Sequence, residues 1–341
     1  MVPEISREVK LTARSEGLPQ AGDFAIVGVP LPLPRAGEAL VRNRYFLVSA
    51  SLRAMIAKGA EHIKGVPFPA LREGDTLAGS ALGEIVSAPP DSGLQTGDLV
   101  VHHKGWREYA AVAPAQCHKA DEALPDPVAH LGHGWTAYAA LTRGAAIKSG
   151  DTVFVSSAAG AIGSMAGQIA RLLGAGRVIG STGSLAKAAR LVSELGYDAC
   201  LVRGSRSIAD QLLEAAPDGL DVFLDNVGGE QLQAGILAAR EGASIVIVGT
   251  LARQLAIRDP GLAVPVTIDP FQLLLKWITI RGYSADDHPH AREEWMTRLR
   301  DWLARGAIRL PREIVVGLER SPAALERAIR GDYFGTVLVE L

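Results

Sequence analysis

The residues with the clearest chemical meaning form a short glycine-containing stretch in the middle of the chain. Asp151–Gly163, with the sequence DTVFVSSAAGAIG, joins an apolar, β-branched run to a helical pattern. Gly160 and Gly163 allow the backbone to turn tightly and approach a pyrophosphate, and the next helix offers unpaired N–H groups and the positive end of its dipole. The first glycine of the usual G-x-G-x-x-G fingerprint is absent. The strand–turn–helix context still predicts a dinucleotide site, with an ordinary βα turn as the alternative.

The type of dinucleotide is decided about 20 residues further on, at the end of the second strand. An acidic residue there would bind a ribose 2′-hydroxyl, but the chain has Ser181-Thr182-Gly183-Ser184. Lys187 follows at the start of the next helix, and Arg203 follows the third strand. Hydroxyl groups and two cations suit a phosphomonoester through charge-assisted hydrogen bonds. The sequence therefore predicts NADPH rather than NADH.

The elements around these residues indicate an α/β sheet. From residue 126 to about 285, short apolar runs alternate with helical patterns such as 163–173 and 187–195. Strands are expected at 152–156, 177–180, 222–224 and 245–248. Continuous apolar strands alternating with helices imply a parallel sheet covered on both faces.

The two ends of the chain have a different pattern. The first third is rich in short strands, expected at 39–41, 45–48 and 99–101, between Pro- and Gly-containing turns. After a helix near 293–304, extended segments return at 313–316 and 336–340. We therefore expect the C-terminal tail to rejoin the first domain.

Composition narrows the class of protein. The chain has 341 residues, 48% of them hydrophobic and 21% charged, which suits a globular protein of two domains. A net charge of −2 gives no basic footprint for nucleic acid, and two cysteines cannot build a disulfide framework or a four-thiolate zinc site. The charged start of the sequence and the absence of roughly 18–20 uninterrupted apolar residues argue against a signal peptide and a membrane span. A cytoplasmic protein is expected.

Several motifs together resemble one family. The sequence is similar to the zinc-independent medium-chain dehydrogenase/reductases, in the branch of NADPH-dependent alkenal or double-bond reductases that includes prostaglandin reductase and curcumin reductase. The motifs are Gly105-Trp106-x-Glu108-Tyr109, Ala158–Ser164, Gly167-Gln168, Leu195–Asp198, Asp225–Gly229 and Gly282-Tyr283. The resemblance implies a GroES-like β-rich catalytic domain from residues 1–125 and 305–341. It also implies a Rossmann domain, a doubly wound parallel sheet, at 126–304, and commonly a homodimer.

The resemblance also assigns cofactor contacts by position. Lys187 would hold the 2′-phosphate near Ser181 and Gly183, and Arg203 stands where the family often has a tyrosine. The pyrophosphate would lie on Ala159, Gly160, Ala161, Ile162 and Gly163. The nicotinamide half would lie along Thr136, Asn226, Gly249, Thr250 and Tyr283.

The sequence does not favour a metal ion at the site. Cys117-His118 and His102-His103 are adjacent pairs, and neighbours on a strand point to opposite faces, which makes them poor joint ligands. Without a metal, hydride addition to the activated C=C bond of an enone or enal is more accessible than addition to C=O. Hydrogen-bond donors must then stabilise an enolate oxygen, and a proton must reach the α-carbon. We therefore predict a metal-free reductase of small unsaturated carbonyl compounds.

The proton source is the least determined part of the prediction. Tyr45 and His133 are candidate donors, with solvent as an equal alternative. Where the family usually carries a tyrosine facing the substrate, the spacing gives Gln254, whose amide can donate a hydrogen bond but cannot act as an acid. A quinone reductase and a low-turnover NADPH-binding sensor are the alternative functions.

Overall fold

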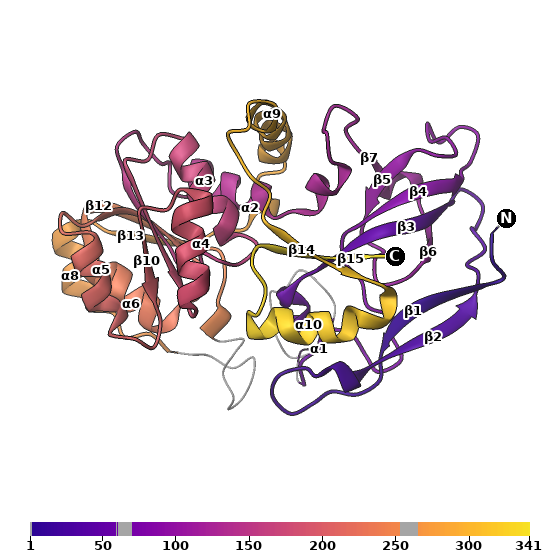
Figure 1. The fold of residues 1–341 in the computed structure, drawn as a ribbon, viewed down its shortest axis with the longest axis horizontal. Helices are drawn as coiled ribbons and strands as arrows, with labels where there is room; N and C mark the ends of the chain where they lie inside the picture. The colour runs from indigo at the N-terminus through magenta and orange to yellow at the C-terminus, as the bar shows by residue number, and fades with distance from the viewer. Residues whose placement is uncertain (1, 59, 61–69, 253–264) are drawn as a thin grey trace. The chain divides into compact units, whose positions relative to one another are not determined.

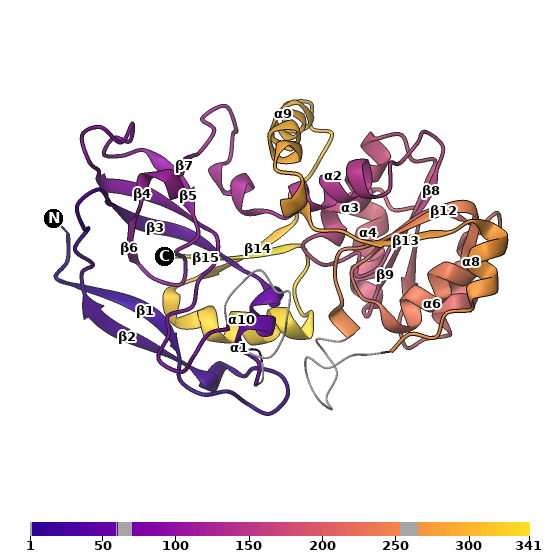
Figure 2. The same ribbon diagram turned by 180° about the vertical axis from the view of Figure 1, so that it is seen from behind.

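The computed structural model describes residues 2–58, 60, 70–252 and 265–341, which form two compact units (Figures 1 and 2). The β-rich unit contains the described residues up to Gly132 together with Arg312–Leu341. The α/β unit contains the described residues from His133 to Pro311. The division therefore falls later along the chain than the expected changes after 125 and 304.

The segment just before Gly132 shows why the first unit extends so far. The 3₁₀ helix Pro127–Leu131 places Val128 and Leu131 among the buried side chains of the β-rich unit. The carboxylate of Asp126 also forms an ion pair with Arg312. These contacts attach 126–132 to the strands rather than to the helices that follow.

The α/β unit is built on a parallel sheet, six-stranded in the described part of the chain, with the order β10-β9-β8-β11-β12-β13. Its strands are β8 (Thr152–Val155), β9 (Arg177–Thr182), β10 (Ala199–Val202), β11 (Leu220–Asp225), β12 (Ala239–Ile247) and β13 (Thr279–Gly282). The main helices are α3 (Gly163–Leu172), α4 (Leu185–Leu195), α5 (Ile208–Ala215), α6 (Gly229–Ala238) and α8 (Pro270–Lys276). Figures 1 and 2 show helices on both faces. The doubly wound parallel sheet predicted from the sequence is confirmed.

Apolar packing holds this sheet in place. Phe154 and Phe223, on neighbouring strands, stack with ring centroids 4.7 Å apart and are almost without exposed surface. Helix α4 ends at Gly196, which has φ +71°, a backbone conformation that glycine adopts at little cost. Beside the sheet, α2 (Gly134–Ala139) packs on α9 (His290–Ala304) so closely that a Cβ at Gly134 would lie 2.2 Å from the ring of Trp295.

The β-rich unit carries a second sheet with the order β14-β15-β3-β4-β5-β7, to which β6 adds beside β3. Its strands are β3 (Ala39–Val48), β4 (Ala81–Ser87), β5 (Leu99–His102), β6 (Tyr109–Val112), β7 (His118–Lys119), β14 (Arg312–Val316) and β15 (Thr336–Glu340). A separate hairpin joins β1 (Ile5–Leu11) to β2 (Phe24–Pro30), and the helices are α1 (Arg53–Ile56) and α10 (Ser321–Arg330). Strand β15 pairs with β3, so the C-terminal tail completes the first sheet as expected.

One strand prediction in this unit is wrong. The runs 39–41 and 45–48 were expected to be separate strands, but both belong to β3. The register shifts between Asn43 and Tyr45, and the buried Asn43 amide donates hydrogen bonds to the carbonyls of Lys104 and Arg107. Those bonds satisfy a polar side chain inside the strand, so the strand continues through it.

Within the described residues, no helix is both long and apolar enough to cross a bilayer.

Candidate functional site

The expected cofactor residues gather at one edge of the parallel sheet. Each follows the carboxyl end of a strand: Gly160–Gly163 after β8, Gly183 after β9, Arg203 after β10, Asn226 after β11, Gly249 after β12 and Tyr283 after β13. The strand order reverses direction between β8 and β11, which is where ligands bind in open α/β sheets. Residues far apart in the sequence, from Gly160 to Tyr283, are therefore brought to one edge.

The glycine turn after β8 is held by close backbone packing. Ser157 has φ +52°, and a Cβ added at Gly163 would lie 2.3 Å from the Ser157 carbonyl oxygen. The hydroxyl of Tyr197 donates to the Gly163 carbonyl at 2.6 Å. Helix α3 begins here without a side-chain cap among the described residues. The N–H groups of Ser164, Met165 and Ala166 already donate to carbonyls of the turn, so an anion would meet the turn itself and the positive end of the helix dipole.

Ser181 is buried next to the glycine turn. Its side chain has no exposed surface, and its hydroxyl donates to Gln231 while accepting from the Ser157 N–H at 3.3 Å. The hydroxyl therefore links the glycine turn to Gln231 of α6. A direct contact of Ser181 with the cofactor stays a prediction.

A cationic corner lies after β9 and β10. The Arg203 N–H donates to the Thr182 carbonyl at 2.8 Å, and a Cβ added at Gly183 would lie 3.3 Å from Arg203 Nη2. Ser184 caps α4 by accepting from the Lys187 N–H at 3.4 Å, which sets Lys187 in the first helical turn. The guanidinium, the ammonium and the start of α4 together suit a phosphomonoester.

The end of β11 holds a buried carboxylate that sequence reasoning did not single out. Asp225 accepts from the Ser156 hydroxyl at 2.7 Å and from the N–H groups of Val227 and Gly228 at 2.9 and 3.0 Å. Burial raises the pKa of this carboxyl group. The Ser156 hydroxyl in turn accepts from the Asn226 N–H at 2.7 Å. The Asp-Asn-Val-Gly-Gly motif was the available signal, but only its asparagine was assigned a role.

Asn226 is left with an open hydrogen-bond acceptor. Its Nδ2 donates to the Ser156 carbonyl at 2.7 Å, whereas its buried Oδ1 has no partner among the described residues. Gly249 lies against it, since a Cβ there would be 2.9 Å from the Asn226 carbonyl oxygen. A buried acceptor is normally paired, so this atom fits a donor group of a ligand. Thr250, which is exposed, follows Gly249, and Thr136 lies in α2.

Along the sheet edge, the cationic corner after β10 and β9, the glycine turn after β8 and the open acceptor after β11 follow one another in strand order. A phosphorylated dinucleotide carries its 2′-phosphate, pyrophosphate and nicotinamide ribose in that same order. The described residues therefore fit NADPH.

Tyr45, the first proton-donor candidate, is engaged inside the β-rich unit. Its hydroxyl donates to Glu340 Oε1 on the adjacent strand β15 at 2.7 Å. That hydrogen bond, together with burial, raises the pKa of the phenol. The structure gives Tyr45 a cross-strand role in the sheet, and its hydroxyl already has an acceptor.

His133, the second candidate, directly precedes α2 in the α/β unit. Desolvation lowers the pKa of its imidazole, and Nδ1 has no partner among the described residues. A lowered pKa keeps this ring neutral at neutral pH, so it suits hydrogen-bond donation better than acid catalysis. Gln254, the third candidate, lies outside the described residues.

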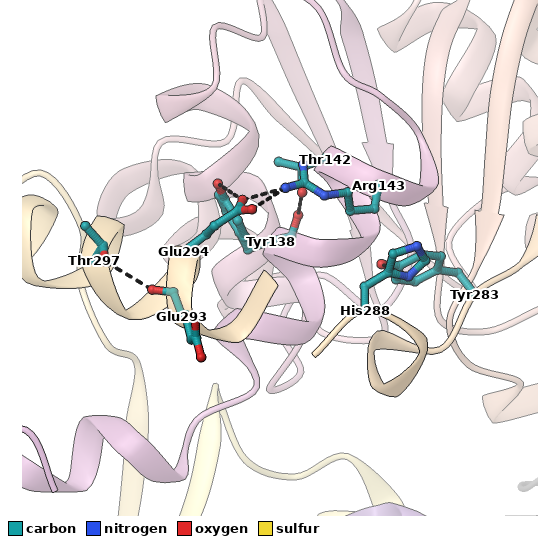
Figure 3. Close-up of polar contacts among 8 residues, drawn as sticks. All are labelled: Tyr138, Thr142, Arg143, Tyr283, His288, Glu293, Glu294 and Thr297. Atoms are coloured by element: carbon teal, nitrogen blue, oxygen red, sulfur yellow. Dashed lines mark hydrogen bonds and ion pairs between the residues drawn. The ribbon is translucent and has the colours of Figure 1, made fainter. Parts of the chain in front are cut away.

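A further pair of residues stands at the end of β13 (Figure 3). The hydroxyl of Tyr283 lies 3.1 Å from Nδ1 of His288, and the two rings stack with centroids 5.3 Å apart and planes 16° from parallel. Nearby, Arg143 forms an ion pair with Glu294, which also accepts from the Tyr138 hydroxyl. The sequence pointed to Tyr283 but not to His288, because His288 reaches the tyrosine only through the intervening 3₁₀ turn.

The donor set for a metal ion is poor. Among the described residues, no group of three or more His, Cys, Asp or Glu side chains is placed to hold one. Burial raises the pKa of the Cys117 thiol and raises the pKa of Cys200 to about 12, so both stay protonated. Zinc binds cysteine as thiolate. The described residues therefore do not fit a catalytic zinc ion.

Comparison with known proteins shows which protein family the chain matches. Residues 161–305 match the family described as zinc-binding dehydrogenase, and residues 7–120 match the N-terminal domain of oxidoreductase. Prostaglandin reductase 1 of Rattus norvegicus is 31% identical, over 95% of this chain and 96% of its own length. The NADPH-dependent curcumin reductase of Escherichia coli is 28% identical, over 98% of this chain and 97% of its own.

A solved structure agrees with these relatives. CurA from Vibrio vulnificus in complex with NADPH has a TM-score of 0.87 and 30% identity, covering 98% of each chain. The chain belongs to the medium-chain dehydrogenase/reductase family.

Proposed function

We propose that the protein is an NADPH-dependent reductase that adds hydride to the activated C=C bond of an enone or enal. The observation that carries this proposal is the strand-end site itself, in which Arg203 lies over Gly183 and Asn226 Oδ1 is an open acceptor. Relatives named as curcumin, prostaglandin and 2-alkenal reductases support the substrate class.

The residues of the site divide the work of binding. The glycine turn and the positive end of the α3 dipole would hold the pyrophosphate, and Lys187 and Arg203 would hold the 2′-phosphate. Asn226 and Gly249 would fix the nicotinamide end. Bound NADPH supplies the hydride, while the protein supplies position and hydrogen-bond donors for the developing enolate oxygen.

A substrate panel tests the proposal. NADPH consumption is measured with enones, enals, quinones and simple ketones, with NADH in parallel. We expect turnover of enones and enals with NADPH and identification of the saturated carbonyl compound as product. Turnover of quinones alone would replace this function with quinone reduction. Tight NADPH binding without turnover of any compound would favour a sensor.

We also propose that the enzyme is a homodimer formed through the edge of the α/β sheet. Strand β13 is the last strand of the described sheet on that side. Next to it, Phe271, Leu274, Leu275 and Trp277 are 59%, 67%, 56% and 71% exposed. An open strand edge beside exposed apolar side chains is typical of a surface that a second copy covers.

A further inference from the structure

We propose that Tyr283 and His288 form a proton relay that delivers the proton to the α-carbon of the reduced substrate. This inference rests on the proposed function, because it assigns the proton step of that reaction. The Tyr283 hydroxyl would touch the substrate and give up its proton, and His288 would return a proton to the tyrosine.

The pair links a largely buried tyrosine to solvent. Tyr283 is 8% exposed, whereas His288 is partly exposed. The 3.1 Å contact between the hydroxyl and Nδ1 is short enough for proton transfer. The 3₁₀ turn Ala285–Asp287 holds the ring in place, because the His288 N–H donates to the Ala285 carbonyl at 3.0 Å.

Tyr283 also borders the part of the site that fits the nicotinamide. Its N–H donates to the Ile247 carbonyl at 2.9 Å, and Ile247 is the last residue of β12, two positions before Gly249. Strands β11, β12 and β13 are successive neighbours, about 4.8 Å apart. The tyrosine therefore stands two strands from Asn226 along the same sheet edge.

The charges around the phenol suit a proton donor. Burial raises the pKa of Tyr283, so the hydroxyl keeps its proton at neutral pH. The positive charges of Arg143 and Arg281 lower the pKa of Tyr283, and the Arg281 guanidinium lies 5.7 Å from the ring centroid. The negative charge of Asp287 raises the pKa, as burial does. The two cations would stabilise the tyrosinate that remains after the proton leaves.

The step balances without a further reactant. Hydride adds to the β-carbon, and the C=C electron pair moves toward the carbonyl oxygen to give an enolate. The O–H bond of Tyr283 breaks as a C–H bond forms at the α-carbon. The tyrosinate oxygen then takes the Nδ1 proton of His288, which gains a proton from solvent at Nε2.

The other described candidates serve this step less well. The Tyr45 hydroxyl already donates to Glu340, and the lowered pKa of His133 keeps its imidazole neutral. The Tyr283–His288 pair has both a proton to give and a route by which solvent replaces it.

The test compares Tyr283→Phe with Tyr138→Phe. Both changes remove one phenol oxygen, and the Tyr138 hydroxyl bonds only Glu294 among the described residues (Figure 3). An enone with an α-methyl group is reduced in D2O, and the configuration and deuterium content at the α-carbon are measured at early times. We expect Tyr283→Phe to lower kcat about 100-fold. We also expect it to give nearly racemic product, because water then reaches both faces of the enolate.

Binding and rescue separate chemistry from structure. The NADPH dissociation constant of Tyr283→Phe is expected to stay within about threefold of wild type, and Tyr138→Phe is expected to match wild type throughout. His288→Ala is expected to lose about tenfold in kcat and to recover with added imidazole, since the ring is partly exposed.

The relay is overturned if Tyr283→Phe retains both kcat and a single product configuration while wild type reduces enones. In that case the proposed function stands and the proton has another source. If wild type reduces no enone or enal, the proposed function and the relay fall together.

Discussion

Arg203 and Lys187 are the residues on which cofactor choice depends. Each contributes a positive charge to the corner after β9 and β10, where a 2′-phosphate would lie. We expect Arg203→Ala to raise the KM for NADPH about 30-fold, equivalent to about 2 kcal/mol of charge-assisted hydrogen bonding, and to leave the KM for NADH within about twofold.

A neighbouring arginine provides the control for this prediction. Arg206, three positions after Arg203, forms an ion pair with Glu214 on the surface. Arg206→Ala should leave both KM values unchanged. Equal changes in the two KM values for Arg203→Ala would contradict its assignment to the phosphate.

His102 makes stability depend on pH. Its side chain has no exposed surface, and its Nε2 is 2.8 Å from Asn43 Oδ1. Desolvation lowers the pKa of His102 to about 3. Below about pH 6.5, His102 binds a proton in the unfolded chain but stays neutral in the folded chain. The free energy of unfolding therefore falls by about 1.4 kcal/mol for each pH unit below that value.

Urea unfolding at pH 7 and pH 5 measures this effect. Wild type is expected to lose about 2 kcal/mol from this histidine between the two pH values. His102→Gln is expected to be less stable at pH 7 but to lose correspondingly less on acidification. His118→Gln, at an exposed histidine, should keep the wild-type dependence. If His102→Gln loses as much free energy of unfolding between pH 7 and pH 5 as wild type does, the His102 ring is not the cause of the pH dependence.

At the level of single residues, the sequence predicted positions better than contacts. Gly183, Lys187, Arg203 and Asn226 follow strand ends, and strand ends can be found from apolar runs alone. The partners of buried groups could not be found that way. The enclosure of Ser181 by Gln231 and the return of His288 to Tyr283 depend on packing between segments far apart in the sequence or on a single turn.

The βα turn before α3 is the element most sensitive to change. A Cβ at Gly163 would lie 2.3 Å from the Ser157 carbonyl oxygen and 2.6 Å from the Ala158 Cα, and neither backbone atom can move freely. We expect Gly163→Ala to lower stability by about 1–3 kcal/mol and to abolish measurable NADPH binding. Denaturant unfolding and calorimetric titration measure the two effects.

Gly22 supplies the matched control, because a Cβ there would meet nothing within 4 Å. Gly22→Ala should leave NADPH binding as it is. If Gly163→Ala binds NADPH with wild-type affinity, the turn does not hold the pyrophosphate.

Buried elements were predictable, and exposed ones were not. Helix α3 and strand β8 start at the residues expected, because both are buried along most of their length and their apolar runs stand out in the sequence. Helix α8 was not foreseen, since most of its apolar side chains are exposed and show no buried stripe. Its start depends on local chemistry instead, with the Asp269 side chain accepting from the Phe271 N–H at 3.0 Å.

For the whole molecule, the proposed dimer is the clearest consequence of the exposed surface. Leu274 and Trp277 lie beside the open edge of β13. We expect Leu274→Glu to convert the dimer into monomer, because a charge buried without a partner at an interface is strongly unfavourable. Size-exclusion chromatography with light scattering measures the mass.

Leu33, which is 86% exposed in the β-rich unit, provides the comparison. Leu33→Glu should leave the mass of a dimer unchanged. A wild-type protein that is monomeric at all concentrations would remove the dimer proposal and leave the site unaffected.

The limits of the two units depend on packing that the sequence does not show. The change from strands to alternating strands and helices is visible in the sequence. The attachment of 126–132 to the β-rich unit is not, because it depends on where Val128, Leu131 and the Asp126 carboxylate find partners.

The most direct measurement follows a labelled hydride. The enzyme reduces an enone with NADPH that carries deuterium at the transferred position, and the product is examined by NMR. The account predicts a saturated ketone with one deuterium at the β-carbon. Deuterium at the carbonyl carbon of an alcohol, or no transfer from a cofactor that binds, would contradict it.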